Sequence, residues 1–270
     1  MPELPEVEVC RLGIQPHVIN QVVAEVIVRN AKLRWPIPEE VTLLSGQRII
    51  KVERRAKYLL LRFTTGTLLL HLGMSGTIRI IQNDVAVKKH DHFDLVFQNN
   101  TVLRLNDPRR FGAVLWLAEH LDTQNLLTKL GPEPLSDEFA YGHLFEKAKN
   151  KKVPIKTFLM NNHNVVGVGN IYANEVLFLA GVLPTTTAGS LSEATFDKIT
   201  DIIKQVLSAA IKQGGTTLKD FTQADGRPGY FAQSLNVYGR AGEKCLQCQT
   251  ILEEIRQSNR SSVFCPNCQQ

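Results

Sequence analysis

Four cysteines near the C-terminus constrain the fold of this chain more than any other feature. Cys245 and Cys248 form one C-x2-C pair, Cys265 and Cys268 form another, and sixteen residues separate the pairs. Two such pairs are a common ligand set for structural zinc, which four thiolates enclose as a tetrahedron. We therefore predict one structural Zn2+ here, with no coordination position left for a substrate. Two disulfides are the alternative, but they are uncommon in a chain without an export signal.

The residues between the two cysteine pairs are expected to form a β-hairpin. So small a module has little core of its own, and its folding depends on the metal. The hairpin would hold Arg260 at a rigid tip, and a guanidinium held in this way is suited to contact a phosphate.

Short apolar runs dominate the first half of the 270-residue chain. They predict β-strands at 22–28, 48–52, 58–63, 67–72, 77–81, 92–97, 101–105 and 113–116. No helix-length segment separates them, so an antiparallel sandwich or barrel is expected rather than a parallel α/β sheet. A short helix over 7–16 would precede the strands.

The Gly- and Pro-rich stretch at 130–135 marks a change to helical periodicity. Helices are predicted at 137–149, 154–160, 170–180, 192–213 and 217–221. The chain is therefore expected to be an α+β protein of more than one domain.

The composition gives only weak evidence about the cellular compartment and the binding partner. The net charge is +5 and the pI is about 8.9, which favours a polyanionic partner. No apolar run is long enough for a membrane span, and no signal peptide is visible, so we expect a cytosolic protein without a membrane partner.

The first residues, Met1 to Glu6, combine two prolines with two carboxylates. Once Met1 is removed, Pro2 becomes a secondary amine. An α-amino group has a pKa of about 7.7–8.0, so part of it is neutral and nucleophilic near physiological pH. Glu3 would lie beside it as a proton donor or acceptor. The alternative is a frayed terminus without a function.

Two further segments favour nucleic acid as the partner. The turn at 107–112 carries Arg109, Arg110 and Phe111, and a basic turn with an exposed ring is suited to enter a base stack. Phe111 packed inward is the alternative. The glycines at 166–172 open a helix whose first N–H groups are suited to bind a phosphate.

Taken in order along the chain, these motifs resemble the bacterial formamidopyrimidine-DNA glycosylase family. The resemblance rests on PELPEVE at 2–8, RRAKYLL at 54–60, HLGMSG at 71–76, HDH at 90–92, DPRRFG at 107–112, LGPEPL at 130–135, VGVGNIYA at 166–173, GGTTLKDF at 214–221, DGRPGYF at 225–231, VYGR at 237–240 and the four cysteines. It covers the whole chain and is highly specific as an ordered set.

The resemblance implies a fold and a set of domains. A catalytic antiparallel β-sandwich with a leading helix would occupy 1–130, and a hinge would follow at 131–152. A helix–two-turn–helix domain would lie at 153–235 and the zinc finger at 236–270. It also implies a monomer associated with the nucleoid.

The resemblance also implies an activity. Oxidised purines such as 8-oxoguanine would be excised from double-stranded DNA, and the strand would be cut by β,δ-elimination. The catalytic residues would be Pro2 as nucleophile, Glu3 as acid, and Lys57 and Arg260 on the phosphates beside the lesion. The other DNA contacts would come from His71, His90, Arg109, Asn170, Lys156, Met74 and Phe111. A loop at 217–230 would close over the flipped base.

The chain departs from the family's usual residues at Cys10, Asn106, Asn161 and Asn259. Two other functions compete with the implied one. An endonuclease VIII-like glycosylase would prefer oxidised pyrimidines, but such enzymes usually have Gly where this chain has Leu4 and lack the DPRRFG turn. A non-catalytic zinc-finger protein that only binds DNA would have no need of Pro2 and Glu3.

Overall fold

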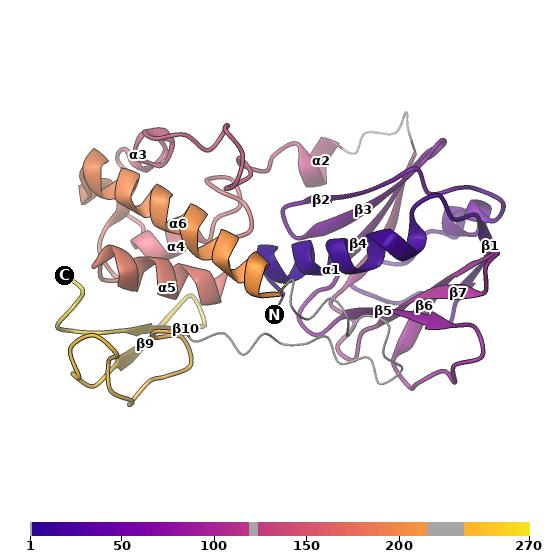
Figure 1. Ribbon diagram of the computed structural model, residues 1–270. Helices are drawn as coiled ribbons and strands as arrows, with labels where there is room; N and C mark the ends of the chain where they lie inside the picture. The colour runs from indigo at the N-terminus through magenta and orange to yellow at the C-terminus, as the bar shows by residue number, and fades with distance from the viewer. Residues whose placement is uncertain (1, 119–123, 215–234) are drawn as a thin grey trace. The chain divides into compact units, whose positions relative to one another are not determined.

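The fold is taken from a computed structural model that describes residues 2–118, 124–214 and 235–270 (Figure 1). The chain divides into two compact units, one formed by Met1–Thr128 and Ile211–Phe231 and one formed by Lys129–Ala210 and Ala232–Gln270. The finer division into a hinge, a helical domain and a finger stays a prediction. In the part of the chain that is described, we find no helix long and apolar enough to cross a membrane.

The first unit opens with helix α1 (Leu4–Val18), which starts earlier than the predicted residue 7. Glu3 is its N-cap, and a capping box joins the two ends of the first turn. The Glu3 carboxylate accepts the N–H of Glu6, while the Glu6 carboxylate accepts the N–H of Glu3 at 2.7 Å. Pro5 fits this first turn because its missing N–H would have had no partner there. Cys10 lies buried on the inner face of the helix.

Eight strands form two four-stranded antiparallel sheets, which confirms the expected sandwich. The first sheet has the order β1 (Val23–Val28), β6 (Asp91–Phe97), β7 (Thr101–Asn106) and β5 (Thr77–Gln82). The second has the order β2 (Lys51–Arg55), β3 (Tyr58–Phe63), β4 (Gly66–His71) and β8 (Ala113–Ala118). β2 lies further along the chain than the predicted 48–52.

One apolar core joins the two sheets and α1. Leu59 and Leu61 of one sheet and Phe93 and Leu95 of the other belong to it, and so does Ile14 of α1. Side chains two residues apart in a strand point to the same face, so each of these pairs faces the core together. A 3-10 helix, η1 (Glu39–Leu44), adds Val41 and Leu44 to the same core.

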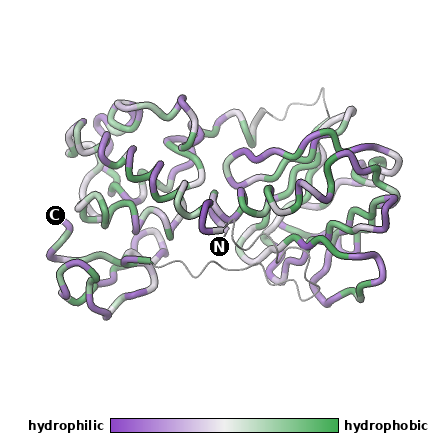
Figure 2. Tube along the Cα trace, in the orientation of Figure 1, coloured by the Kyte–Doolittle hydropathy of each residue, from purple (hydrophilic) through white to green (hydrophobic). Residues whose placement is uncertain are grey.

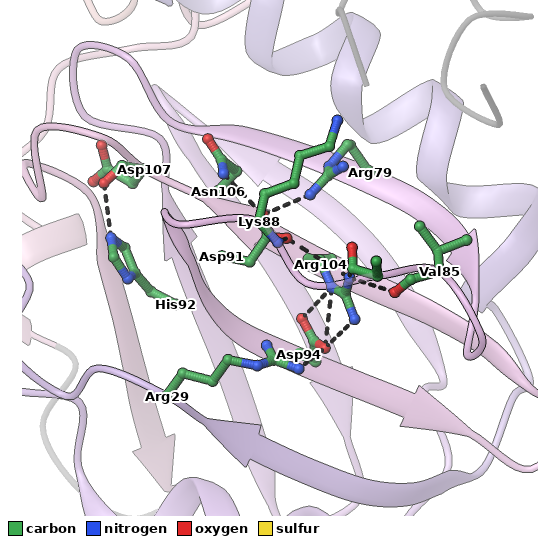
Figure 3. Close-up of polar contacts among 11 residues, drawn as sticks. Arg29, Arg79, Val85, Lys88, Asp91, His92, Asp94, Arg104, Asn106 and Asp107 are labelled. Atoms are coloured by element: carbon green, nitrogen blue, oxygen red, sulfur yellow. Dashed lines mark hydrogen bonds and ion pairs between the residues drawn. The ribbon is translucent and has the colours of Figure 1, made fainter. Parts of the chain in front are cut away.

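The other face of the first sheet carries a buried network of charged side chains (Figure 3). Arg104 bonds both carboxylate oxygens of Asp94, and Arg29 lies 2.6 Å from the same carboxylate. Arg79 bonds Asp91 at 2.5 Å. Buried charges need such partners, because removal of one member leaves its neighbour uncompensated.

The second unit is helical around its own core. Its elements are α3 (His143–Ala148), α4 (Ile155–Leu159), α5 (Asn170–Ala180), η2 (Ala188–Ser190) and, as far as Ala210, α6 (Glu193–Gly214). The last residues of α6 and the short α2 (Gln124–Leu127) belong to the first unit. The helix predicted over 137–149 begins only at His143, because Gly142 before it has a φ of +77°. Along α6, hydrophobic and hydrophilic positions alternate, as expected for a helix with one buried face (Figure 2). The helix predicted at 217–221 lies outside the described residues.

The C-terminal hairpin has the predicted form. Strands β9 (Glu253–Gln257) and β10 (Arg260–Phe264) pair antiparallel. Ser258 and Asn259 connect them, and both have a positive φ, as a tight two-residue hairpin turn requires. The hairpin lies against α5, where the Asn174 side-chain oxygen accepts the N–H of Val263 at 2.8 Å.

Candidate active site and nucleic-acid interface

The N-terminal pair, Pro2 and Glu3, is held at the start of α1. Pro2 is half-buried, and the side chain of Glu3 is buried within the capping box. The helix therefore fixes the backbone that immediately follows Pro2. A secondary amine at this position, freed by removal of Met1, would have a carboxyl group on the next residue.

An ion-pair cluster ties α1 to the hairpin that carries Lys57. Glu8 bonds Arg11 at 2.6 Å and Arg54 at 2.9 Å. Burial alone would raise the pKa of Glu8, but the hydrogen bonds and charges of Arg11 and Arg54 outweigh it and lower that pKa. Arg54 is thus anchored rather than free on a solvated face, and Lys57 follows it in the turn between β2 and β3.

His71 ends β4 as a neutral hydrogen-bond donor. Its Nδ1 accepts the N–H of Gly73 at 3.1 Å, which leaves the proton on Nε2. Burial, followed by the charges of Arg34 and Lys57, lowers its pKa to about 4. The ring is therefore uncharged at physiological pH, and its Nε2–H is available to a phosphate oxygen.

The sequence reasoning missed Arg34. Its side chain is exposed and lies over the Trp35 ring at 4.6 Å, and its N–H donates to the carbonyl of Gly112 at 3.1 Å. The sequence Arg34-Trp35 held a clue, because tryptophan is the ring that binds cations best in a cation–π pair. Arg34 and Lys57 both lie close enough to His71 for their charges to lower its pKa, so Arg34 adds a second cation beside that ring.

The reading loop, which we define as residues 107–112, exposes both of its predicted DNA contacts. Phe111 is 44% exposed, so it does not pack inward, and Arg109 lies over its ring at 4.8 Å. The carboxylate of buried Asp107 accepts the N–H of Gly112 at 2.7 Å and the hydroxyl of Ser75 at 3.2 Å. Asp107 thereby holds the loop closed.

The neighbouring turn at 73–76 lies against the reading loop. A Cβ on Gly73 would meet the carbonyl carbon of Phe111 at 2.4 Å, so only glycine fits. Met74 follows Gly73 and is 39% exposed. His90 is half-buried, and its carbonyl accepts the N–H of Asp107. The structure thus brings Met74, His90, Arg109 and Phe111 together around Asp107.

In the second unit, α5 links the predicted phosphate contact Asn170 to the finger. Asn170 is the first residue of the helix, after N-cap Gly169, so it lies where helix N–H groups favour an anion. One turn on, Asn174 bonds the finger strand β10. Asn170 and the finger therefore share one rigid support.

Glu175 is a second residue that the sequence reasoning missed. Its buried carboxylate accepts the N–H groups of Asn236, Val237 and Tyr238 and the side-chain amide of Asn236, all at 2.8–2.9 Å. Four donors stabilise a buried carboxylate. The sequence did hold a clue to Glu175: it is the only acidic residue of α5, and an acidic side chain in an apolar helix is buried only when it has partners.

Lys156, a predicted DNA contact, is 1% exposed. Its ammonium donates to the carbonyl of Ser261 at 2.5 Å and to the hydroxyl of Ser262 at 2.7 Å. These serines follow Arg260, which is exposed at the start of β10. Direct contact of Lys156 with DNA stays a prediction, and its described bonds favour a role in positioning Arg260.

Replacement of Lys156 tests that support. We expect Lys156→Met, which keeps the side-chain volume, to lower the free energy of unfolding by about 1–3 kcal/mol, because the half-buried Ser261 carbonyl and the buried Ser262 hydroxyl lose their donor. The exposed Lys152 provides the control, and Lys152→Met should change stability by less than about 0.5 kcal/mol. Chemical denaturation measures both, and equal stability of the two variants would contradict the assigned support.

The four predicted zinc ligands converge on one point. Their Sγ atoms all lie within 4.8 Å of one another. Zinc at about 2.3 Å from each sulfur would place the sulfurs about 3.8 Å apart. The Cys245–Cys268 and Cys248–Cys265 Sγ distances, 4.0 and 3.4 Å, fit this geometry. All four are free thiols, so the disulfide alternative fails and the site is that of one structural zinc ion.

A β-sandwich with a proline–glutamate start, a helical unit and a four-cysteine finger defines a zinc-finger DNA glycosylase. Three family models match: the formamidopyrimidine-DNA glycosylase N-terminal domain over 1–114, its H2TH domain over 130–222, and the zinc finger found in FPG and IleRS over 242–270.

Whole-chain comparisons agree with these domain matches. Formamidopyrimidine-DNA glycosylases from Colwellia psychrerythraea and Yersinia enterocolitica are 75% and 55% identical, each over 100% of both chains. Lactococcus lactis Fpg in complex with abasic-site DNA has a TM-score of 0.88 at 31% identity, with 99% of both chains covered. Thermus thermophilus MutM (Fpg) has a TM-score of 0.85 at 37% identity, covering 99% of this chain and 98% of that one.

The chain belongs to the formamidopyrimidine-DNA glycosylase family. It is therefore a DNA glycosylase of base excision repair, with the AP lyase activity that characterises this family. Membership removes the two competing functions, a glycosylase of the endonuclease VIII type and a non-catalytic DNA-binding protein.

Proposed function

We propose that this enzyme removes oxidised purines, such as formamidopyrimidines and 8-oxoguanine, from double-stranded DNA through a covalent bond to Pro2. The observation that carries the proposal is the position of Pro2, directly before the capped start of α1 and the buried carboxyl of Glu3. Family membership and the DNA complexes of its structural neighbours support it further.

The chemistry follows from a secondary amine. The nitrogen of Pro2 attacks C1′ as the bond from C1′ to the damaged base breaks, and the base leaves with the bonding electron pair and takes up a proton. Glu3 protonates the sugar ring oxygen, the ring opens, and an iminium forms between C1′ and the nitrogen of Pro2. A secondary amine gives an iminium that keeps its positive charge without a proton.

That positive charge acts as an electron sink for strand cleavage. Loss of a proton from C2′ expels the 3′ phosphate, and a second elimination expels the 5′ phosphate. Water then hydrolyses the iminium, which restores the amine of Pro2 and releases the sugar remnant as an unsaturated aldehyde. One nitrogen thus serves both base removal and cleavage of the strand.

The DNA contacts divide by unit. In the first unit, Lys57 and His71 bind phosphates, one by charge and the other through its neutral Nε2–H. In the second unit, Arg260 and Asn170 also bind phosphates that flank the lesion. The family's loop at 217–230, proposed to close over the flipped base, lies outside the described residues.

The reading loop and Met74 fill the space that the flipped nucleotide leaves. Phe111 enters the stack, and Arg109 donates hydrogen bonds to the acceptors of the cytosine left without a partner. His90 lies beside the loop and contacts the DNA with it. The protein works as a monomer in the cytoplasm, where it associates with the nucleoid.

Borohydride trapping tests the proposal. We expect the enzyme without Met1, mixed with an 8-oxoguanine duplex and borohydride, to give a reduced adduct through Pro2, which peptide mass analysis locates. An oxidised-pyrimidine duplex should give much less adduct. Protein of the correct mass that forms no adduct with 8-oxoguanine DNA would refute the mechanism.

A further inference from the structure

We propose that His92 is a positioning residue for the reading loop: it donates a hydrogen bond to the carbonyl of Asp107 and so fixes the direction in which Arg109 and Phe111 project. The inference rests on the proposed function, in which the reading loop enters the base stack. His92 itself touches no DNA in this proposal.

A β-bulge turns His92 toward the loop. Asp91 pairs with Asn106 and Phe93 pairs with Leu105, so His92 is one extra residue on β6 without an opposite partner on β7. A bulge changes the direction of a side chain that regular alternation would place elsewhere. His92 is only 6% exposed, and its ring reaches the end of β7, where Asp107 begins the reading loop (Figure 3).

The main-chain N–H and the carbonyl of Asp107 both form hydrogen bonds with residues 90–92, the segment that contains the bulge. The N–H of Asp107 donates to the carbonyl of His90 at 2.9 Å. The carbonyl of Asp107 lies 3.0 Å from Nε2 of His92. A carbonyl only accepts, so Nε2 of His92 carries the hydrogen in this bond. The same carbonyl accepts the N–H of Arg110 at 3.2 Å, which uses its second lone pair.

The orientation of Asp107 is transmitted to the rest of the loop. Its carboxylate holds Gly112 and Ser75, so the residues between 107 and 112 are fixed at both ends. On the far side of the loop, the carbonyl of Gly112 is bonded by the N–H of Arg34. A rotation of the peptide after Asp107 would therefore move Arg109 and Phe111 while the ends of the loop stay attached.

The buried charge network keeps the bulge in place. One carboxylate oxygen of Asp91 accepts from Arg79 at 2.5 Å and from the side chain of Asn106 at 2.8 Å, and the other accepts the N–H of Lys88 at 2.7 Å. Burial alone would raise the pKa of Asp91, but the bonds from Lys88 and Asn106 and the charge of Arg79 lower it overall. Asn106, one of the departures from the family's usual residues, therefore secures Asp91 from the partner strand.

A structural histidine and a positioning histidine predict different kinetics. If His92 only filled space in the sheet, its replacement would affect every substrate equally through lost stability. If His92 positions the reading loop, its replacement slows the reaction only on double-stranded substrates, because the loop acts by entering the base stack. A single strand with an abasic site has no opposite base, and Pro2 reaches its C1′ without a wedge.

Two substitutions separate these cases. His92→Met and His92→Gln have closely similar volumes, but only glutamine offers an N–H to the carbonyl of Asp107. We expect His92→Met to lower kcat/KM for an 8-oxoguanine:cytosine duplex by about three- to tenfold, the effect of one lost hydrogen bond. Cleavage of a single-stranded abasic oligonucleotide should stay within about twofold. His92→Gln should restore most of the duplex activity.

Several outcomes would overturn the proposal. If His92→Met lost kcat/KM equally on both substrates, His92 would serve stability alone. If His92→Met lost no kcat/KM on the duplex, or if His92→Gln did not recover it, the hydrogen bond to Asp107 would have no part in the mechanism. Should His92→Met be unfolded at the assay temperature, His92→Asn takes its place, since its shorter amide falls short of the carbonyl. Failure of the proposed function is distinct: the unmodified enzyme itself would then give no borohydride adduct.

Discussion

A chain that keeps any residue before Pro2 should bind lesion DNA yet neither release the base nor cut the strand. Met1 or a longer extension turns the nitrogen of Pro2 into an amide, whose lone pair is delocalised into the carbonyl and does not attack C1′. We expect base release and strand cleavage to fall by at least about a thousandfold, as when other enzymes lose their nucleophile. A cleavable N-terminal extension gives both forms from one preparation.

The control for this experiment is the same protein after cleavage to expose Pro2, which should regain full activity. A second variant, Pro2→Gly with a free N-terminus, offers a primary amine whose imine must be protonated to act as an electron sink. It should lose most strand cleavage. Affinity for an uncleavable abasic analogue should change little in all three, and equal cleavage by the extended chain would contradict Pro2 as nucleophile.

Loss of the zinc ion should abolish tight DNA binding. Cys265→Ala removes one of four ligands, and the finger has only a small apolar cluster, around Val237, Leu252 and Val263, to replace the metal. We expect zinc content to fall from one per chain to near zero and DNA affinity to fall about a hundredfold or more, because the hairpin no longer holds Arg260. Metal analysis and a binding titration measure the two effects.

Cys10 supplies the matched control, because it is equally buried and lies outside the metal cluster. Cys10→Ala should keep one zinc per chain and bind DNA within about threefold of the unmodified enzyme. Treatment with a chelator should reproduce the Cys265→Ala phenotype in the unmodified chain. Tight binding of DNA by metal-free protein would show that the finger folds without its ion.

The sequence predicts the elements that local pattern controls. Short apolar runs and cysteine spacing depend on neighbours along the chain, so the eight strands and the zinc site follow from them. The residues at which helices begin and end are predicted less accurately from the sequence. Gly142 shortens α3 through its left-handed backbone, and Pro5 lies inside α1 because the capping box of Glu3 extends the helix to include it.

Contacts between residues far apart in the chain could not be predicted from the sequence. The family resemblance implies a DNA contact for Lys156, yet its side chain is buried beside Ser261, more than a hundred positions away. His92 reads as part of an alternating strand, and only the register between β6 and β7 reveals the bulge. Such contacts depend on which strands become neighbours, which one sequence does not specify.

The buried position of Cys10 on α1 has a consequence for an enzyme that acts on oxidised DNA. Burial raises the pKa of its thiol to about 12, so the protonated thiol dominates at pH 7. Peroxides attack the thiolate, and their product would force a polar sulfenic acid into the core against α1. We therefore expect the helix that follows the nucleophile to resist the same oxidants that create the enzyme's substrates.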